Sequence, residues 1–133
     1  MLVVDASVVV PACLAADGFA EFGTEQLIAP ALLWSESLSV LHELVWRREI
    51  SAEDGNLARE TLRHAPIERV DVELVGEEAW RIADELGWAK TYDAEYVALA
   101  RLRECRLVTL DGRLHRSGKR LGLIVSRTPA QAV

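Results

Sequence analysis

The chain has 133 residues, half of them hydrophobic, with a net charge of −6. This length suits one domain, spanning residues 1–133, that buries a hydrophobic core of its own. No apolar run is long enough to cross a bilayer and the first ten residues lack the basic flank of a signal peptide, so we expect a cytoplasmic protein.

In the first half of the chain, short apolar runs alternate with helical periodicity. Runs of three apolar residues predict buried strands, and apolar residues three and four apart predict amphipathic helices. Ser51 with Asp54 has the pattern of a helix N-cap. These signals predict a strand at 2–4, a helix at 7–15, a loop or helical turn at 18–23, a strand at 27–29 that stops at Pro30, and helices at 31–48 and 51–64. The predicted buried face of the helix at 31–48 is Leu33, Ser37, Val40, Leu41, Leu44 and Arg48.

The second half continues the alternation of strands and helices. Gly87 is placed to end one helix and Thr91 to cap the next. The predicted elements are a strand at 67–72, a helix at 73–86, a helix at 92–104, a strand at 106–110, a basic helix at 113–121 and a strand at 123–125. The predicted apolar stripe of the helix at 92–104 is Ala94, Val97, Ala98 and Leu102.

Strands that alternate with helices and are apolar throughout pair in parallel, because helices cover both faces of the sheet. The sequence therefore predicts an α/β fold, a three-layer α/β/α sandwich around a central, mostly parallel sheet. In sheets of this kind, sites lie at the carboxyl ends of the strands.

Three aspartates occupy such positions. Asp5 and Asp111 each follow a predicted strand directly, and Asp93 lies in the first turn of a predicted helix. Each has an ordinary structural alternative: a helix cap for Asp5, a helix dipole for Asp93 and an Asp-Gly turn for Asp111. Position alone leaves these alternatives open.

Glu36 is harder to explain as a surface residue. It borders the predicted buried face of its helix and has no basic residue three or four positions away, whereas Glu43 has Arg47 at i+4. A carboxylate beside a core needs a cation or a hydrogen-bonding network. Four acids without nearby cations indicate a bound metal, and ligands that are all oxygens favour Mg²⁺ or Mn²⁺. Such ions serve phosphodiester hydrolysis.

Charge is distributed unevenly along the chain. Residues 101–133 carry eight basic and two acidic side chains, so they are positive, and residues 1–100 are strongly negative. A basic segment on an acidic body can bind a phosphate backbone despite the negative total. The alternative is a solvated basic helix, which is the usual use of a charge run.

Four motifs in order resemble the PIN-domain family. They are Leu2-Val3-Val4-Asp5-Ala6-Ser7, Ala29-Pro30 before the helix that bears Glu36, Tyr92-Asp93-Ala94, and Thr109-Leu110-Asp111. The resemblance covers essentially the whole chain and is greatest to VapC-type ribonuclease toxins of VapBC toxin–antitoxin systems. It implies an endoribonuclease dependent on Mg²⁺ or Mn²⁺ that cuts RNA, such as tRNA or rRNA. It also implies a homodimer and a VapB-like antitoxin partner.

The resemblance also implies roles for individual residues. The catalytic and metal-binding residues would be Asp5, Glu36, Asp93 and Asp111. Ser7 and Thr109 match small hydroxyl positions that would support them. The RNA-binding residues would be Arg113, Arg116, Lys119 and Arg120. Glu95 lies next to the motif and is not counted in it.

A flap-type DNA nuclease would share this chemistry but usually needs a longer chain, and two further alternatives exist. One is a non-catalytic PIN-like module that binds RNA or protein, although none of the four acids is missing. The other is a receiver-like signalling domain, which needs an acidic pair at the first strand, where this chain has Val4 and Ala6 around Asp5. Apolar residues around Trp34, Leu38 and Trp46 suggest a partner helix or a dimer contact.

Overall fold

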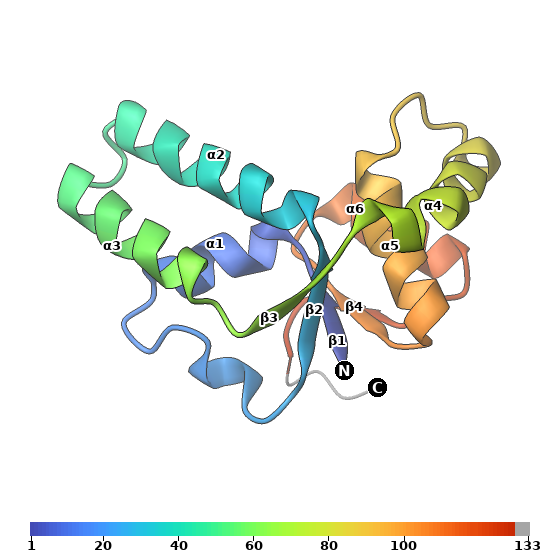
Figure 1. Cartoon of the computed structure of the whole chain (residues 1–133), viewed down its shortest axis with the longest axis horizontal. Helices are drawn as coiled ribbons and strands as arrows, with labels where there is room; N and C mark the ends of the chain where they lie inside the picture. Colours follow the sequence, from blue (N-terminus) through green and yellow to red (C-terminus); the bar gives the residue numbers. More distant parts are fainter. Residues whose placement is uncertain (130–133) are drawn as a thin grey trace.

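The computed structural model describes residues 1–129, and within them five strands form one parallel sheet (Figure 1). The strands are β1 (Leu2–Val4), β2 (Leu27–Pro30), β3 (Ile67–Val70), β4 (Arg106–Val108) and β5 (Val125–Ser126). They lie in the order β3-β2-β1-β4-β5, and every pairing is parallel. The predicted α/β fold with a central parallel sheet is therefore confirmed. β4 ends two residues before the predicted limit of 110, and β5 begins two residues after the predicted start at 123.

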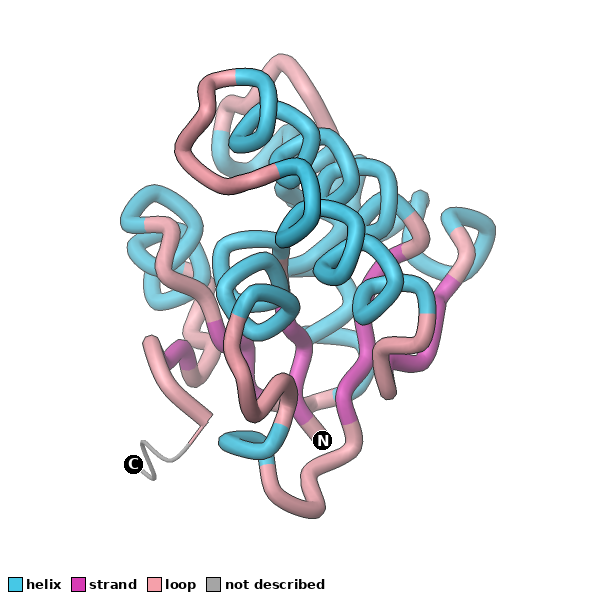
Figure 2. Tube along the Cα trace, turned by 90° about the vertical axis from the view of Figure 1, so that its left-hand side faces the viewer, coloured by secondary structure: helices cyan, strands magenta, loops and turns pink. Residues whose placement is uncertain are grey.

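The helices form two groups on opposite sides of this sheet (Figure 1). They are α1 (Ala6–Leu14), the 3₁₀ turn η1 (Ala20–Phe22), α2 (Leu32–Trp46), α3 (Ala52–Arg63), α4 (Val72–Leu86), α5 (Tyr92–Arg103) and α6 (Gly112–Arg120). Helices α1, α2 and α3 pack on one another, whereas α5 packs on β1, β2, β4 and α4. Figure 2 shows the short strands gathered at the end of the molecule where the chain begins, with most of the helical mass above them.

The strand order explains this division into two groups. The chain runs from β1 outward to β3, then crosses back to β4 and continues to β5. Because crossovers between parallel strands are right-handed, a reversal of direction moves the later helices to the opposite face of the sheet. Because of the reversal, β1 and β4 are neighbours, and the segments that follow them run to opposite faces of the sheet. This arrangement is called a topological switch point, and parallel sheets bind ligands there.

Helix α5 lies between the sheet and α4 and is buried nearly all round. Its residues 94–100 are all buried, and Leu102 is 49% exposed. The predicted one-sided stripe was therefore wrong at Leu102. The reason is that α5 has sheet on one side and α4 on the other, so burial no longer follows the period of a surface helix.

Other differences from the predicted elements are local. The buried face of α2 is Leu33, Ser37 and Leu41, and it packs against α1 and α3, so Val40 and Arg48 are exposed rather than buried. Val72 begins α4 instead of ending β3. Two predicted helix ends are confirmed, since Ser51 accepts a hydrogen bond from the Asp54 amide at 3.0 Å and Gly87 has a left-handed φ of 70°. The predicted capping by Thr91 is wrong, because Thr91 precedes α5 but its side chain makes no capping hydrogen bond. No helix in residues 1–129 has the length and apolarity to span a membrane.

Candidate active site

Asp5 lies at the carboxyl end of β1 and connects that strand to β4. Its side chain is 5% exposed and makes no capping hydrogen bond to α1. Instead it accepts hydrogen bonds from the hydroxyls of Ser7, at 2.5 Å, and Thr109. The sequence alternative in which Asp5 simply caps a helix therefore does not describe this side chain.

Ser7 and Thr109 are themselves held by the backbone that follows β4. The amide of Leu110 donates to Ser7 Oγ at 2.8 Å, and the amide of Asp111 donates to Thr109 Oγ1 at 3.0 Å. Each hydroxyl accepts from a backbone amide and donates its own proton to Asp5. Asp5 therefore accepts both of these hydrogen bonds, and the two hydroxyls fix the orientation of its carboxylate.

Glu36 projects from the first turns of α2 and is half-buried. Its Oε1 accepts a 2.5 Å hydrogen bond from the hydroxyl of Tyr96, which lies in α5 and is 1% exposed. Burial and the adjacent Glu36 raise the pKa of Tyr96, so the hydroxyl stays protonated and remains a donor. Tyr96 orients Glu36 without neutralising it, and the sequence analysis did not identify this partner.

Asp93 and Asp111 stand at the N-terminal ends of two helices. Asp93 lies in the first turn of α5, half-buried, and Asp111 caps α6 by accepting from the Leu114 amide at 2.9 Å. The capping role that the sequence left open for Asp111 is thus present. Asp111 is nevertheless close enough to the other acids to act on them, because its charge raises the pKa of both Asp5 and Asp93.

The carboxyl groups of this site share an electrostatic environment that disfavours their charged forms. Burial raises the pKa of Asp5, Glu36 and Asp93, and the neighbouring acids raise it further. Glu95, which was not counted as a site residue, is also buried, and burial together with the charge of Glu36 raises its pKa. The charge of Asp111 thus acts on Asp5 and Asp93, and the charges of Asp5 and Asp93 act on Glu36.

The donor set fits a hard divalent cation in its chemistry. The groups are carboxylate oxygens with excess negative charge, and those of Glu36 and Asp93 are only half-buried, so they have room to move. Within residues 1–129, no three His, Cys, Asp or Glu side chains already form a cluster that could hold an ion. Binding a cation would therefore require these carboxylates to move together.

A cleft of about 430 Å³ opens beside two of these acids. It is lined by Glu36, Trp88, Ala89, Lys90, Tyr92, Asp93 and Arg113. The guanidinium of Arg113, on α6, lies 4.8 Å from the centre of the Trp88 ring, and its charge lowers the pKa of Asp93 against the larger effect of burial. Trp88 and Tyr92 were not identified from the sequence, although both lie within five residues of Asp93.

The four predicted RNA-binding residues differ in their distance from the cleft. Arg113 lines the cleft, whereas Arg116, Lys119 and Arg120 are exposed farther along α6 and do not line it. Burial lowers the pKa of His115, and the charges of Lys119 and Arg116 lower it further. The result is a basic helix beside the acidic site.

A larger hollow of about 830 Å³ lies between α2 and α3, away from the carboxylates. Its apolar lining includes Leu38, Leu41, Val45 and Trp46, and Trp46 is 77% exposed. Trp34 does not line it, because its ring stacks with Arg69 at 4.4 Å. The predicted apolar group around Trp34, Leu38 and Trp46 is thus divided between two places.

Comparison with known proteins gives consistent matches over nearly the whole chain. A family model described as PIN domain matches residues 2–119. Ribonuclease VapC9 of Mycobacterium tuberculosis is 40% identical over 121 residues, which cover 90% of this chain and 92% of that protein. The structure of PAE2754 from Pyrobaculum aerophilum is 23% identical with a TM-score of 0.72, covering 93% of this chain and 82% of that one.

A second solved structure has a title that states an activity. Mycobacterium tuberculosis VapC20, described as a Sarcin-Ricin loop cleaving toxin, is 17% identical with a TM-score of 0.58. The match covers 89% of this chain and 95% of that one. At this identity the likeness concerns the fold alone.

Proposed function

This chain belongs to the PIN-domain family and, within it, to the VapC ribonucleases, and we propose that it is a metal-dependent endoribonuclease, the toxin of a toxin–antitoxin pair. The observation that carries the proposal is the group of carboxylates at the switch point between β1 and β4, where Asp5, Glu36 and Asp93 all have raised pKa values. An excess of buried negative charge at a ligand-binding edge supports a cation site.

We assign Asp5 and Asp93 as primary ligands of Mg²⁺ or Mn²⁺, with Glu36 and Asp111 completing the shell directly or through water. When bound, such an ion polarises the phosphate, activates a water molecule and stabilises the leaving oxygen. Ser7 and Thr109 orient both oxygens of Asp5, and Tyr96 binds Oε1 of Glu36. Asp111 uses Oδ1 to cap α6, which leaves Oδ2 available.

The reaction that follows is hydrolysis of an RNA phosphodiester by water. Attack in line with the 3′ oxygen breaks the P–O3′ bond and leaves a 5′-phosphate and a 3′-hydroxyl. The basic residues of α6, namely Arg113, Arg116, Lys119 and Arg120, would bind the RNA backbone, because cations beside the acidic site offset its repulsion of phosphate. The cleavage assay also identifies the target, which is tRNA, rRNA or another RNA.

We propose a VapB-like antitoxin as the protein partner. The hollow between α2 and α3 supports this, since exposed apolar residues such as Leu38 and Trp46 suit the apolar face of a partner helix. A homodimer has a separate exposed apolar surface available on α4, where Leu74 and Trp80 are mostly exposed.

The test of the activity is RNA cleavage by protein purified free of any antitoxin. We expect cleavage with Mg²⁺ or Mn²⁺ and none with a chelator, and loss of cleavage in Asp5→Asn and Asp93→Asn. Glu43→Gln is the matched control, because Glu43 forms an exposed ion pair with Arg47 on α2. Undiminished cleavage in both site variants would exclude the proposed site. RNA binding without cleavage would favour the non-catalytic module instead.

A further inference from the structure

The cleft beside Glu36 and Asp93 combines aromatic rings with cations, a combination that the metal chemistry does not require. Trp88 comes from the loop between α4 and α5, Tyr92 is the first residue of α5, and Lys90 lies between them. Arg113 reaches the same cleft from α6. Tyr92 is 60% exposed, so its ring is available to a ligand.

Arg113 connects the aromatic part of this cleft to the acidic part. Its guanidinium lies 4.8 Å from the centre of the Trp88 ring, which is a cation–π distance that holds the side chain in place. Arg113 is also the cation whose charge acts on Asp93. One planar cation therefore lies beside both an indole ring and a proposed catalytic carboxylate.

The size and lining of the cleft select the kind of ligand. A volume of about 430 Å³ is near the small end of the range of ligand pockets, roughly 300–1,000 Å³, which suits one nucleotide and not a helix. Aromatic rings and arginine planes stack on bases that are unpaired, because the face of a paired base is already covered by its neighbours. Lys90 is exposed and supplies a charge for a phosphate.

We propose that this cleft is a subsite for one unpaired nucleotide next to the scissile phosphate. Its base stacks against Tyr92 and the Trp88-supported guanidinium of Arg113, and Lys90 binds a phosphate. The inference rests on the proposed ribonuclease function and adds to it the residues, Tyr92, Arg113 and Lys90, that hold one nucleotide beside the cut. It also separates Arg113 from the other three basic residues of α6, which bind backbone only.

The experiment uses a single-stranded RNA oligonucleotide with a mapped cut site, in which each nucleotide near the cut is replaced in turn by an abasic one. In the wild-type protein, one abasic position next to the cut lowers kcat/KM by about 5- to 150-fold, the range expected for one stacked base. In Tyr92→Leu and in Arg113→Lys, that position-specific penalty falls to about twofold or less. Arg113→Lys keeps the positive charge and removes the planar guanidinium on which a base can stack.

Arg63→Lys is the matched control for Arg113→Lys, because Arg63 is an exposed arginine on α3 that does not line the cleft. This variant retains the full abasic penalty. Trp88→Leu is a further variant, and since Trp88 packs partly against the core, its melting temperature is measured alongside. Tyr92→Leu and Arg113→Lys alter exposed side chains and keep the proposal testable if Trp88→Leu does not fold.

Binding of the same oligonucleotides to chelator-treated protein, measured by fluorescence anisotropy, separates this inference from the proposed function. If the protein cleaves RNA but no abasic position gives a loss of kcat/KM that depends on Tyr92 or Arg113, the subsite is wrong and the ribonuclease function stands. Binding with the predicted position dependence, but no cleavage under any metal condition, would support the subsite and overturn the ribonuclease.

Discussion

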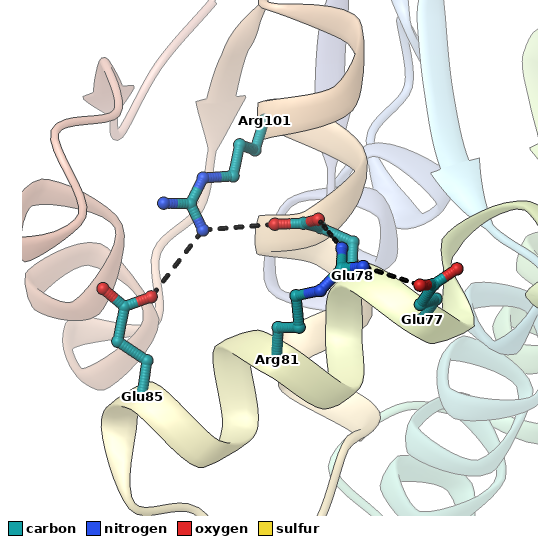
Figure 3. A network of polar contacts seen from close by, with 5 residues as sticks. All are labelled: Glu77, Glu78, Arg81, Glu85 and Arg101. Atoms are coloured by element: carbon teal, nitrogen blue, oxygen red, sulfur yellow. Dashed lines mark hydrogen bonds and ion pairs between the residues drawn. The ribbon is translucent and has the colours of Figure 1, made fainter.

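Helices α4 and α5 carry two groups of carboxylates that differ in their counter-charges. Away from the site, acids of α4 are bridged by arginines of α4 and α5, as Figure 3 shows. The members of this network are Glu77, Glu78, Arg81, Glu85 and Arg101. At the N-terminal end of α5, by contrast, Asp93 faces Asp111 and has Arg113 as the cation that acts on it.

The difference lies in what each group does for the folded chain. Glu78 is bonded to Arg81 at 3.0 Å and to Arg101 at 3.3 Å, so the network joins α4 to α5 and supports the fold. Asp5 and Glu36, by contrast, are held by neutral hydroxyls, which orient these two carboxylates but supply no positive charge. A charge without a counter-charge costs stability, and that cost is the usual mark of a functional site.

The largest expected effect is a loss of RNA cleavage, which we expect when a site carboxylate is changed and not when an acid of the Glu78 network is changed. Asp93→Asn should lower kcat/KM for RNA at least about 100-fold, because metal-ion catalysis contributes several kcal/mol to the transition state. Glu78→Gln removes the same charge from the neighbouring helix and should change kcat/KM less than about twofold well below its melting temperature. Equal losses in both variants would mean that Asp93 acts only through the fold.

Metal addition should stabilise the site and leave the network unaffected. A ligand that binds only the folded protein contributes about 2.7 kcal/mol at one hundred times its Kd. We expect Mg²⁺ or Mn²⁺ to raise the melting temperature of the wild type and of Glu78→Gln, and to have little effect on Asp5→Asn. A rise of the same size in Asp5→Asn would place the cation elsewhere.

The dependence of stability on pH should also differ between the groups. Burial, with neighbouring acids, raises the pKa of Asp5, Glu36 and Asp93, so the folded protein binds more protons than the unfolded chain. Stability from such groups is present at low pH and lost as pH rises through the folded pKa values. In chelator, urea unfolding above pH about 4 should therefore show stability falling with pH.

Asp93→Asn is the sharper form of this pH experiment. The variant should be more stable than the metal-free wild type at neutral pH, because the amide cannot ionise, and its stability should fall less steeply with pH. Glu78→Gln should be less stable than the wild type at the same pH. If Asp93→Asn is instead less stable than the wild type, the attraction between Asp93 and Arg113 outweighs the cost of burying the Asp93 charge beside Asp111.

The smallest expected effect is the loss of the network itself. Glu78→Gln should lower the free energy of unfolding by about 1 kcal/mol or less, since partly exposed ion pairs contribute little. Glu43→Gln, which breaks the single exposed pair with Arg47, should lower it by less still. Both losses should shrink at 1 M salt, where surface charges are screened. A loss that salt does not change would assign Glu78 a packing role.

Sequence patterns were sufficient for the strands and for the approximate ends of the helices. Local signals such as the Ser51 cap and the left-handed Gly87 depend on neighbouring residues, and both were predicted correctly. Burial was predicted less well. Val40 and Leu102 are apolar and in register with buried residues, yet they are exposed, because packing partners and not periodicity decide which face is covered.

By itself, the sequence determined the parallel α/β fold and the edge of the sheet at which Asp5 and Asp111 stand, since both follow from apolar runs and the residues directly after them. Only the tertiary structure decided the contacts of the site. The pairs Thr109 with Asp5, Tyr96 with Glu36, and Arg113 with Trp88 join residues that are 25 to 104 positions apart in the chain. No local periodicity reaches that far, because these contacts exist only once β1 and β4 are neighbours and α2, α5 and α6 are packed around their ends.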